Sequence, residues 1–256
     1  MIPVMETFYS IQGEGTRAGV GSIFVRTGMC NFRCPGFKVE YTVDGEKRYG
    51  CDSYYAVDTA FKKEWDYLET YEEIIDLIDS KLPTFSRHNL FKPDIVFTGG
   101  EPLIFWKNDD YQKVLAHYIT RGHKITIETN AALPIDFTRK YQKEINFSMS
   151  VKLANSGEPE HKRINIENIT NILENTENSY LKFVVNKDTW DVDFAEIKTL
   201  LKAIPSYVES VYLMPLGDVV DVLESNAGFV FEKAMELGFK YSDRLHIRIF
   251  DNKPGV

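Results

Sequence analysis

The chain has 256 residues, of which 30 are Lys or Arg and 38 are Asp or Glu, so its formal net charge is -8. This acidic balance, without a Lys- or Arg-rich run, argues against a nucleic-acid partner bound through its phosphates. No apolar run approaches the ~20 residues that span a bilayer, and residues 1–15 lack the charged start and apolar centre of a signal peptide. We therefore expect a cytoplasmic protein without a membrane partner that forms one domain over residues 1–256 and acts on a small molecule.

Six short runs rich in β-branched or aromatic residues predict buried strands. They cover residues 22–27, 94–98, 124–129, 145–151, 180–185 and 210–214. The segments between most of them are amphipathic and predict helices. One begins at a capping box of Thr70 and Glu73, a second at Asp193 with Glu196, and a third covers residues 219–237 and ends at Gly238.

Alternation of strands and helices favours an α/β fold with a parallel sheet and right-handed crossovers. Six strands fit an incomplete TIM-like barrel better than a closed barrel of eight. An open Rossmann-like sheet remains the alternative, because periodicity does not separate the two. Residues 35–69 differ from this pattern and predict a long insertion, with a hairpin turn at 44–46 between strands at 39–43 and 47–49.

The chain has three cysteines, Cys30, Cys34 and Cys51, which all lie within 22 residues. An odd set of closely spaced thiols suggests one polynuclear metal site. Three thiolates can hold a cubane of four irons and leave one iron open for a chelating ligand. The plainer alternatives are buried small side chains, or a zinc site completed by a histidine such as His88.

Polar motifs follow the ends of five predicted strands, at residues 26–30, 98–102, 128–130, 150–152 and 214–217. In a barrel of parallel strands these ends converge on one face. A single motif of this kind is an ordinary turn or cap, but five around one sheet form a ring of polar groups. We expect a cofactor to lie there.

The cysteine segment, the Gly-Gly-Glu-Pro motif at 99–102 and the strand-end pattern resemble the radical S-adenosylmethionine superfamily. Within it, the chain resembles the 7-carboxy-7-deazaguanine synthase family. The resemblance rests on Phe-Tyr-Ser-Ile-Gln-Gly-Glu-Gly at 8–15, Phe-Val-Arg at 24–26, Cys-Asn-Phe-Arg-Cys at 30–34, Ile-Glu-Thr-Asn at 127–130, Leu-His at 245–246 and Asn-Lys-Pro-Gly-Val at 252–256. The usual Cys-x3-Cys-x2-Cys spacing is not kept, since 16 residues separate Cys34 from Cys51. However, Cys51-Asp52-Ser53 resembles the Cys-Asp-Thr that ends the family's motif.

The resemblance implies an incomplete (β/α)6 barrel of the radical S-adenosylmethionine type with an enlarged cluster-binding loop. It implies a [4Fe-4S] cluster on Cys30, Cys34 and Cys51, S-adenosylmethionine on the open iron, and Mg2+ on Ser53, for which a turn serine is the alternative. The implied cofactor contacts are Gly50, Asp52, Gly100, Glu101, Glu128, Thr129, Asn130, Ser150, Val151, Lys152, Met214, Pro215, Leu216 and Gly217. The implied substrate contacts are Ile11, Gln12, Gly13, Glu14, Arg26, Thr98, His246 and the terminal carboxylate of Val256.

The implied substrate is 6-carboxy-5,6,7,8-tetrahydropterin, converted to 7-carboxy-7-deazaguanine with loss of ammonia in 7-deazapurine biosynthesis. A glutamine and a carboxylate can read the amide and amino edge of a pterin, and an arginine suits its 6-carboxylate. The resemblance also implies an external one-electron donor such as flavodoxin or ferredoxin, and a homodimer. The rival hypotheses are an enzyme that makes a glycyl radical on a partner protein and a non-catalytic zinc-binding interaction module.

Overall fold

A nine-stranded mixed sheet forms the centre of the protein in a computed structural model that describes residues 1–87, 91–205, 210–253 and 255. The strands are β1 (Ile2–Ile11), β2 (Gly21–Thr27), β5 (Asp66–Leu68), β6 (Asp94–Gly99), β7 (Ile125–Thr129), β8 (Asn146–Met149), β9 (Tyr180–Val185), β10 (Val211–Pro215) and β11 (Lys240–Tyr241). Neighbouring strands pair in parallel from β2 through β6, β7, β8, β9 and β10 to β11. On the other side of β2, β1 pairs antiparallel with both β2 and β5.

All six predicted strands are present and form the middle of this sheet in chain order. A doubly wound sheet would reverse its strand order at a switch point, and the described strands from β2 to β11 show no such reversal. The prediction of an α/β fold with a parallel sheet is therefore confirmed. The sequence did not predict strands β1, β5 and β11, which extend the sheet at its two sides.

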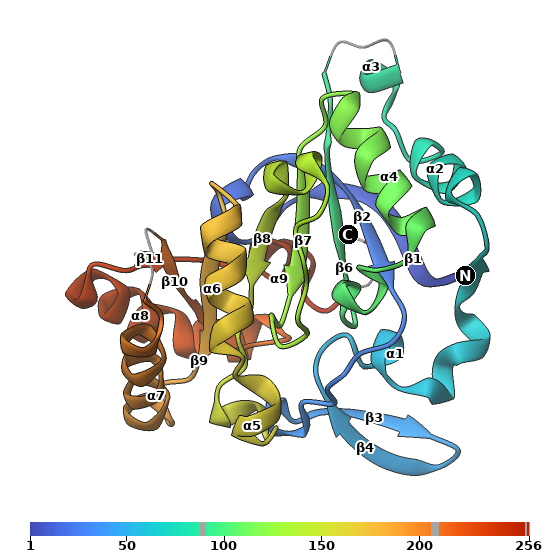
Figure 1. The fold of residues 1–256 in the computed structure, drawn as a ribbon. Helices are drawn as coiled ribbons and strands as arrows, with labels where there is room; N and C mark the ends of the chain where they lie inside the picture. Colours follow the sequence, from blue (N-terminus) through green and yellow to red (C-terminus); the bar gives the residue numbers. More distant parts are fainter. Residues whose placement is uncertain (88–90, 206–209, 254, 256) are drawn as a thin grey trace.

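Helices connect the strands and cover one face of the sheet, where α4 and α6 lie in front of it in Figure 1. The α-helices are α1 (Tyr54–Val57), α2 (Tyr71–Asp79), α3 (Thr84–Arg87), α4 (Asp109–Thr120), α5 (Glu160–Arg163), α6 (Ile166–Asn175), α7 (Trp190–Ala203), α8 (Val220–Leu237) and α9 (Leu245–Phe250). Short 3-10 helices are η1 (Gly15–Arg17), η2 (Pro35–Phe37), η3 (Thr59–Glu64), η4 (Pro102–Phe105), η5 (Lys140–Glu144) and η6 (Ala154–Ser156). Within the described part of the chain, no helix combines the length and apolar character needed to cross a bilayer.

Two of the three predicted helix boundaries are confirmed. The side chain of Thr70 accepts a hydrogen bond from the backbone N–H of Glu73 at the start of α2, and Gly238 ends α8 with φ +67. The predicted start at Asp193 is wrong, because α7 begins after Thr189. The Asp193 carboxylate is buried and accepts hydrogen bonds from Thr189 Oγ1 at 2.6 Å and Asn155 Nδ2 at 3.1 Å, so it serves tertiary contacts rather than a cap.

Side chains alternate between the two faces of the parallel sheet. On β2, Ile23 and Val25 belong to the hydrophobic core, whereas the side chains of Phe24 and Arg26 line a cavity. The other central strands behave in the same way: Phe97, Ile127, Phe183 and Leu213 enter the core, and Thr98, Glu128, Lys182 and Met214 line the cavity. One face of the sheet therefore packs under helices and the other face carries polar groups into a cavity.

The segment between the second and third cysteines contains the predicted hairpin, formed by β3 (Val39–Val43) and β4 (Glu46–Gly50). Its turn is Asp44-Gly45, both with positive φ, which is the backbone of a tight two-residue hairpin loop. The hairpin projects from the bottom of the molecule in Figure 1. After α1 and η3 the chain returns to the main sheet, where β5 pairs with β1.

Candidate functional site

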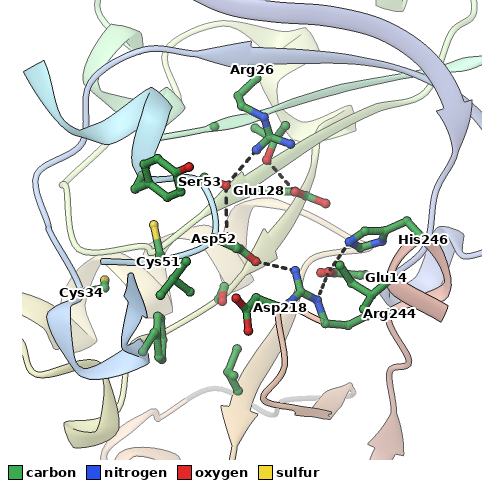
Figure 2. A pocket seen from close by; sticks show the side chains of 18 of the residues that line it. Glu14, Arg26, Cys34, Cys51, Asp52, Ser53, Glu128, Asp218, Arg244 and His246 are labelled. Carbon is green, nitrogen blue, oxygen red and sulfur yellow. Dashed lines mark hydrogen bonds and ion pairs between the residues drawn. The ribbon is translucent and has the colours of Figure 1, made fainter. Parts of the chain in front are cut away.

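A cavity of ≈ 530 Å³ lies on the polar face of the sheet. Its walls come from the carboxyl ends of the parallel strands, the loop between β1 and β2, the segment that follows β4, and helix α9. Figure 2 shows Cys34 and Cys51 at one side of this space and Glu14, Arg244 and His246 at the other. The convergence of strand-end motifs that the sequence predicts is thus present.

All three cysteines line this cavity, and no other cysteine exists in the chain. Burial raises the pKa of Cys34 to about 11 and that of Cys51 to about 12, and it raises the pKa of Cys30 further. Cys30 and Cys51 both pack against the small hydrophobic cluster that contains Cys34, so the three thiols share one part of the cavity wall. Among the described residues, no three Cys, His, Asp or Glu side chains converge closely enough to hold a single metal ion. His88 lies outside the described residues.

Glu158 fixes the backbone between the first two cysteines. Its Oε1 atom accepts hydrogen bonds from the backbone N–H of Arg33 at 2.7 Å and of Cys34 at 2.9 Å. Cys34 itself has φ +51, in the left-handed region, which few residues other than glycine adopt without support. The carboxylate supplies this support. No sequence motif pointed to Glu158, since it lies 124 residues after Cys34.

The Glu101 side chain does not line the cavity. Instead, it holds the backbone that surrounds the cavity. The side chain is fully buried and accepts hydrogen bonds from Leu103 N at 3.0 Å, Thr129 Oγ1 at 2.7 Å and Asn130 N at 2.7 Å. Burial raises its pKa, and these three donors oppose the rise. Glu101 therefore joins the end of β6 to the end of β7.

Glu14 is the centre of the most strongly charged group in the cavity. Its Oε2 lies 2.5 Å from Lys182 Nζ, and its Oε1 lies 3.0 Å from Arg244 Nε and 4.0 Å from His246 Nε2. Burial alone raises the pKa of Glu14, but the positive charges of Lys182 and Arg244 hold it well below its usual value. Burial lowers the pKa of His246, so its imidazole is neutral near pH 7. Glu14 is thus an ionised, acceptor-only group.

Gln12, Thr98 and Glu128 form a hydrogen-bonded chain next to Glu14. Glu128 accepts hydrogen bonds from Gln12 Nε2 at 3.1 Å and from Thr98 Oγ1 at 2.7 Å. The backbone N–H of Glu14 donates to Gln12 Oε1 at 3.0 Å. Glu128, expected among the cofactor contacts, is therefore in direct contact with two residues expected to bind substrate.

Arg26 lies beside Thr98, because the two residues are register partners on the neighbouring parallel strands β2 and β6. Its Nε donates to Glu6 Oε1 at 2.6 Å, and one terminal nitrogen donates to Ser53 Oγ at 3.0 Å. Ser53 Oγ in turn donates to Asp52 Oδ1 at 3.3 Å, and Asp52 Oδ2 lies 2.6 Å from Arg244 Nη2. A continuous polar chain, drawn in Figure 2, thus runs from Arg26 through Ser53, Asp52 and Arg244 to Glu14.

Most of the residues expected to bind substrate, cofactor or metal line this one cavity. Those that do are Ile11, Gln12, Gly13, Glu14, Arg26, Cys30, Cys34, Cys51, Asp52, Ser53, Thr98, Gly100, Glu128, Thr129, Asn130, Ser150, Lys152, Met214, Leu216, Gly217 and His246. Gly50, Glu101, Val151 and Pro215 do not line it, because they belong to the strands and turns that support it. Val256 lies outside the described residues.

Sequence reasoning missed two of the principal charges, Lys182 and Arg244. Lys182 lies on β9 and its side chain is only 4% exposed, so the lysine is buried although it lies in a strand with one polar face. Arg244 immediately precedes α9 and also donates to the carbonyl oxygen of Gly217. Neither residue belongs to a motif. Lys182 is the one charged residue in the apolar run 180–185, and this was the feature from which a functional role could have been suspected.

Sequence comparison finds several similar proteins. The chain is 29% identical over 269 aligned residues to the 7-carboxy-7-deazaguanine synthase of Halobacterium salinarum, an alignment that covers 99% of this chain and 92% of that protein. The corresponding enzyme of Rhodopirellula baltica is 28% identical, with 99% and 88% covered, and that of Pyrobaculum aerophilum is 26% identical, with 99% and 97% covered. No protein-family model matches the chain.

Comparison with solved structures finds the same fold in a known enzyme. The crystal structure of QueE from Escherichia coli matches with a TM-score of 0.60 over 96% of this chain and 94% of that one, at 20% sequence identity. At 20% identity this match shows a shared fold and nothing further. The sequence relatives and the shared fold agree along almost the whole length of the chain.

Proposed function

The chain belongs to the 7-carboxy-7-deazaguanine synthase family, and on this premise we propose that it is a radical S-adenosylmethionine enzyme of 7-deazapurine biosynthesis. The reaction proposed is conversion of 6-carboxy-5,6,7,8-tetrahydropterin to 7-carboxy-7-deazaguanine with loss of ammonia. The observation that carries the proposal is that one cavity holds all three thiols of the chain together with Glu14, Gln12 and Arg26. A cluster on these thiols and a pterin on these side chains would therefore share one space.

Cys30, Cys34 and Cys51 would hold a [4Fe-4S] cluster, with S-adenosylmethionine on the iron that lacks a protein ligand. The donor set suits this group, because all three sulfurs face the same cavity and Glu158 holds the backbone at Cys34. The raised pKa values mean that binding the cluster must displace the thiol protons. When bound, the cluster and S-adenosylmethionine supply the one-electron chemistry that removes a hydrogen atom from the substrate.

Glu14 and Gln12 would read the amide and amino edge of the pterin ring. An ionised carboxylate accepts two N–H groups side by side, and Lys182 and Arg244 keep Glu14 ionised. Arg26 would take the 6-carboxylate through its terminal nitrogens, because Glu6 already occupies its Nε. Thr98 and neutral His246 line the space between these two ends.

Ser53 would ligate Mg2+ together with the substrate carboxylate. Its hydroxyl is a hard oxygen donor of the kind that Mg2+ prefers, and it does not cap the helix that follows it. In the free protein this oxygen accepts a hydrogen bond from Arg26. An ion at Ser53 would therefore release an Arg26 nitrogen toward the same carboxylate.

We further infer the features of the fold and assembly that accompany this function. The sequential parallel strands would form an incomplete (β/α)6 barrel of the radical S-adenosylmethionine type, and residues 35–69 would be an insertion in the cluster-binding loop of a single domain. The remaining cofactor contacts would be Asp52, Gly100, Glu128, Thr129, Asn130, Ser150, Lys152, Met214, Leu216 and Gly217, which line the cavity. Gly50, Glu101, Val151 and Pro215, which do not line it, would support the backbone of these contacts. We also propose a cytoplasmic homodimer reduced by flavodoxin or ferredoxin, in which the Val256 carboxylate contributes to substrate binding.

An anaerobic turnover tests the proposal directly. Reconstituted protein is incubated with 6-carboxytetrahydropterin, S-adenosylmethionine, Mg2+ and a reductant, and the product is identified by mass spectrometry. We expect 7-carboxy-7-deazaguanine and about four irons per chain. Stoichiometric zinc without iron would refute the proposal, and so would cleavage of S-adenosylmethionine without conversion of the pterin.

A further inference from the structure

Lys182 is a buried lysine whose charge is directed at a single carboxylate. Its side chain is 4% exposed, and its Nζ atom lies 2.5 Å from Glu14 Oε2. The neighbouring β9 residues Leu181 and Phe183 point into the hydrophobic core, so the alternation of the strand turns Lys182 toward the cavity. A lysine is rarely buried to this degree unless it is paired.

The charges around Glu14 come from five different segments of the chain. The groups that face it or its partners are Lys182 and Tyr180 on β9, Arg244 before α9, His246 on α9, Asp52 after β4, and Glu128 on β7. Arg244 is shared, because its second nitrogen binds Asp52 at 2.6 Å. Among the described residues, Lys182 forms an ion pair with Glu14 alone, whereas Arg244 divides its charge between Glu14 and Asp52.

We propose that Lys182 is a positioning residue that keeps Glu14 as a charged, two-oxygen acceptor and thereby selects ligands with adjacent amide and amino N–H donors. The inference rests on the proposed function, since it concerns how that site recognises a pterin. Lys182 binds Oε2 and Arg244 Nε binds Oε1, which leaves one acceptor position on each oxygen for the ligand. If Glu14 carried a proton, one oxygen would become a donor and would meet a ligand donor.

The electrostatics around Glu14 support this role. Burial raises the pKa of Glu14, and Lys182 is the largest opposing influence, ahead of Arg244 and His246. Removing Lys182 therefore raises the pKa of Glu14, and the carboxylate begins to take up a proton at a higher pH. Affinity for the ligand should then fall as the pH is lowered, over a range where the unmodified protein keeps its affinity.

The test measures binding of 6-carboxypterin, an oxidised and unreactive analogue that keeps the donor edge and the carboxylate. Dissociation constants are measured between about pH 5.5 and 7.5 for reconstituted protein with S-adenosylmethionine. For Lys182→Met we expect affinity at least about tenfold weaker at the acid end, with partial recovery toward the alkaline end. Lys182→Arg, which keeps the charge, should restore a flat profile. Lys113→Met, which removes an exposed lysine paired with Asp110 on α4, serves as the control and should not alter binding.

A second experiment still tests the inference if Lys182→Met folds poorly because Glu14 is left buried without its lysine partner. Glu14→Gln is compared with the double variant Glu14→Gln/Lys182→Met, in which no carboxylate remains to be held. We expect equal affinities, because Lys182 acts only through Glu14. An unchanged profile in Lys182→Met, a loss that is independent of pH, or a further loss in the double variant would overturn the inference. Failure of the unmodified protein to bind 6-carboxypterin would instead count against the proposed function.

Discussion

Arg26 is oriented by the protein before any ligand enters the cavity. Glu6 binds its Nε at 2.6 Å, and the guanidinium carbon lies 5.7 Å from the centre of the Tyr55 ring. The side chain loses little further freedom when it binds an anion, because its rotamer is already fixed. An arginine held in this way by a carboxylate on one edge presents its other edge to the cavity.

Arg26→Ala should therefore weaken binding of 6-carboxypterin by at least about tenfold, because a charge-assisted pair with the ligand carboxylate is lost. Binding of S-adenosylmethionine should change much less. Arg26→Lys is the matched variant, since it keeps the charge but loses the planar two-pronged geometry, and it should give an intermediate loss. Equilibrium titrations with each ligand measure both effects. Equal losses for the pterin and S-adenosylmethionine would show that Arg26 serves the cavity as a whole.

Arg26 and Lys182, two cations of the cavity, differ in how well the sequence predicts that they belong to a site. Arg26 follows from the motif Phe-Val-Arg, whereas Lys182 alternates with Leu181 and Phe183 and so has the pattern of a residue facing solvent. The structure turns that face of β9 into the cavity. Periodicity gives the side of a strand on which a residue lies, but the tertiary fold decides whether that side meets water or a site.

The loop after β6 packs closely against the cysteine segment. Glu101 N donates to the carbonyl oxygen of Met29 at 2.8 Å, and Gly100 N donates to that of Thr27 at 3.0 Å. A Cβ atom on Gly100 would lie 1.8 Å from the Met29 carbonyl oxygen and 3.1 Å from the backbone nitrogen of Cys30. Glycine at this position therefore permits contact between two backbone segments, one of which carries the first cysteine.

Gly100→Ala should displace the backbone of Met29 and Cys30 and lower the iron content after reconstitution. We expect a loss of about 1–3 kcal/mol in the free energy of unfolding, the usual cost of overpacking. Gly228→Ala on α8 is the control, because a Cβ there meets no atom within 4 Å. It should keep its iron and gain up to about 1 kcal/mol from helix propensity. Iron analysis and denaturant titration test both variants, and full iron content in Gly100→Ala would contradict the expected displacement.

Secondary structure was predictable where a local pattern settles it and not elsewhere. The six central strands are short apolar runs, and α2 carries its capping box within four residues. The predicted start of α7 at Asp193 was wrong, because the Asp193 carboxylate accepts a hydrogen bond from Asn155. This partner lies 38 residues away, and the local sequence does not reveal it. Edge strands such as β11, with two residues, depend on their neighbour and carry no signal of their own.

The cavity joins parts of the chain that are distant in sequence, and ion pairs connect them. Glu14 is 168 residues from Lys182 and 230 from Arg244, and Arg244 is 192 residues from Asp52. Folding brings these charges out of water, which is unfavourable unless each finds its partner. The paired charges thus contribute to the stability of the whole protein as well as to the proposed ligand site.

The pair of Glu14 and Lys182 should make the stability of the protein depend on pH in both directions. The folded pKa of Glu14 lies below its unfolded value of about 4.3, so its contribution is present above that pH and is lost as the pH falls further. The folded pKa of Lys182 lies above its unfolded value of about 10.4, so its contribution is present below that pH and is lost as the pH rises through the folded pKa. Asp52, whose pKa is also lowered, adds to the loss in acid, whereas the raised pKa of Glu101 opposes it.

Acid unfolding of the double variant Glu14→Gln/Lys182→Met tests this coupling. Both side chains are neutral in the variant, so its free energy of unfolding should fall less than that of the unmodified protein between about pH 6 and pH 3. Among the described residues, Arg244 then keeps Asp52 as its acidic partner, which leaves some dependence on pH. Urea titrations at several pH values measure the difference, with the Lys113→Met variant as the surface control. Parallel curves for the double variant and the unmodified protein would show that the buried pair makes no contribution that depends on protonation, although it joins β9 to the loop after β1.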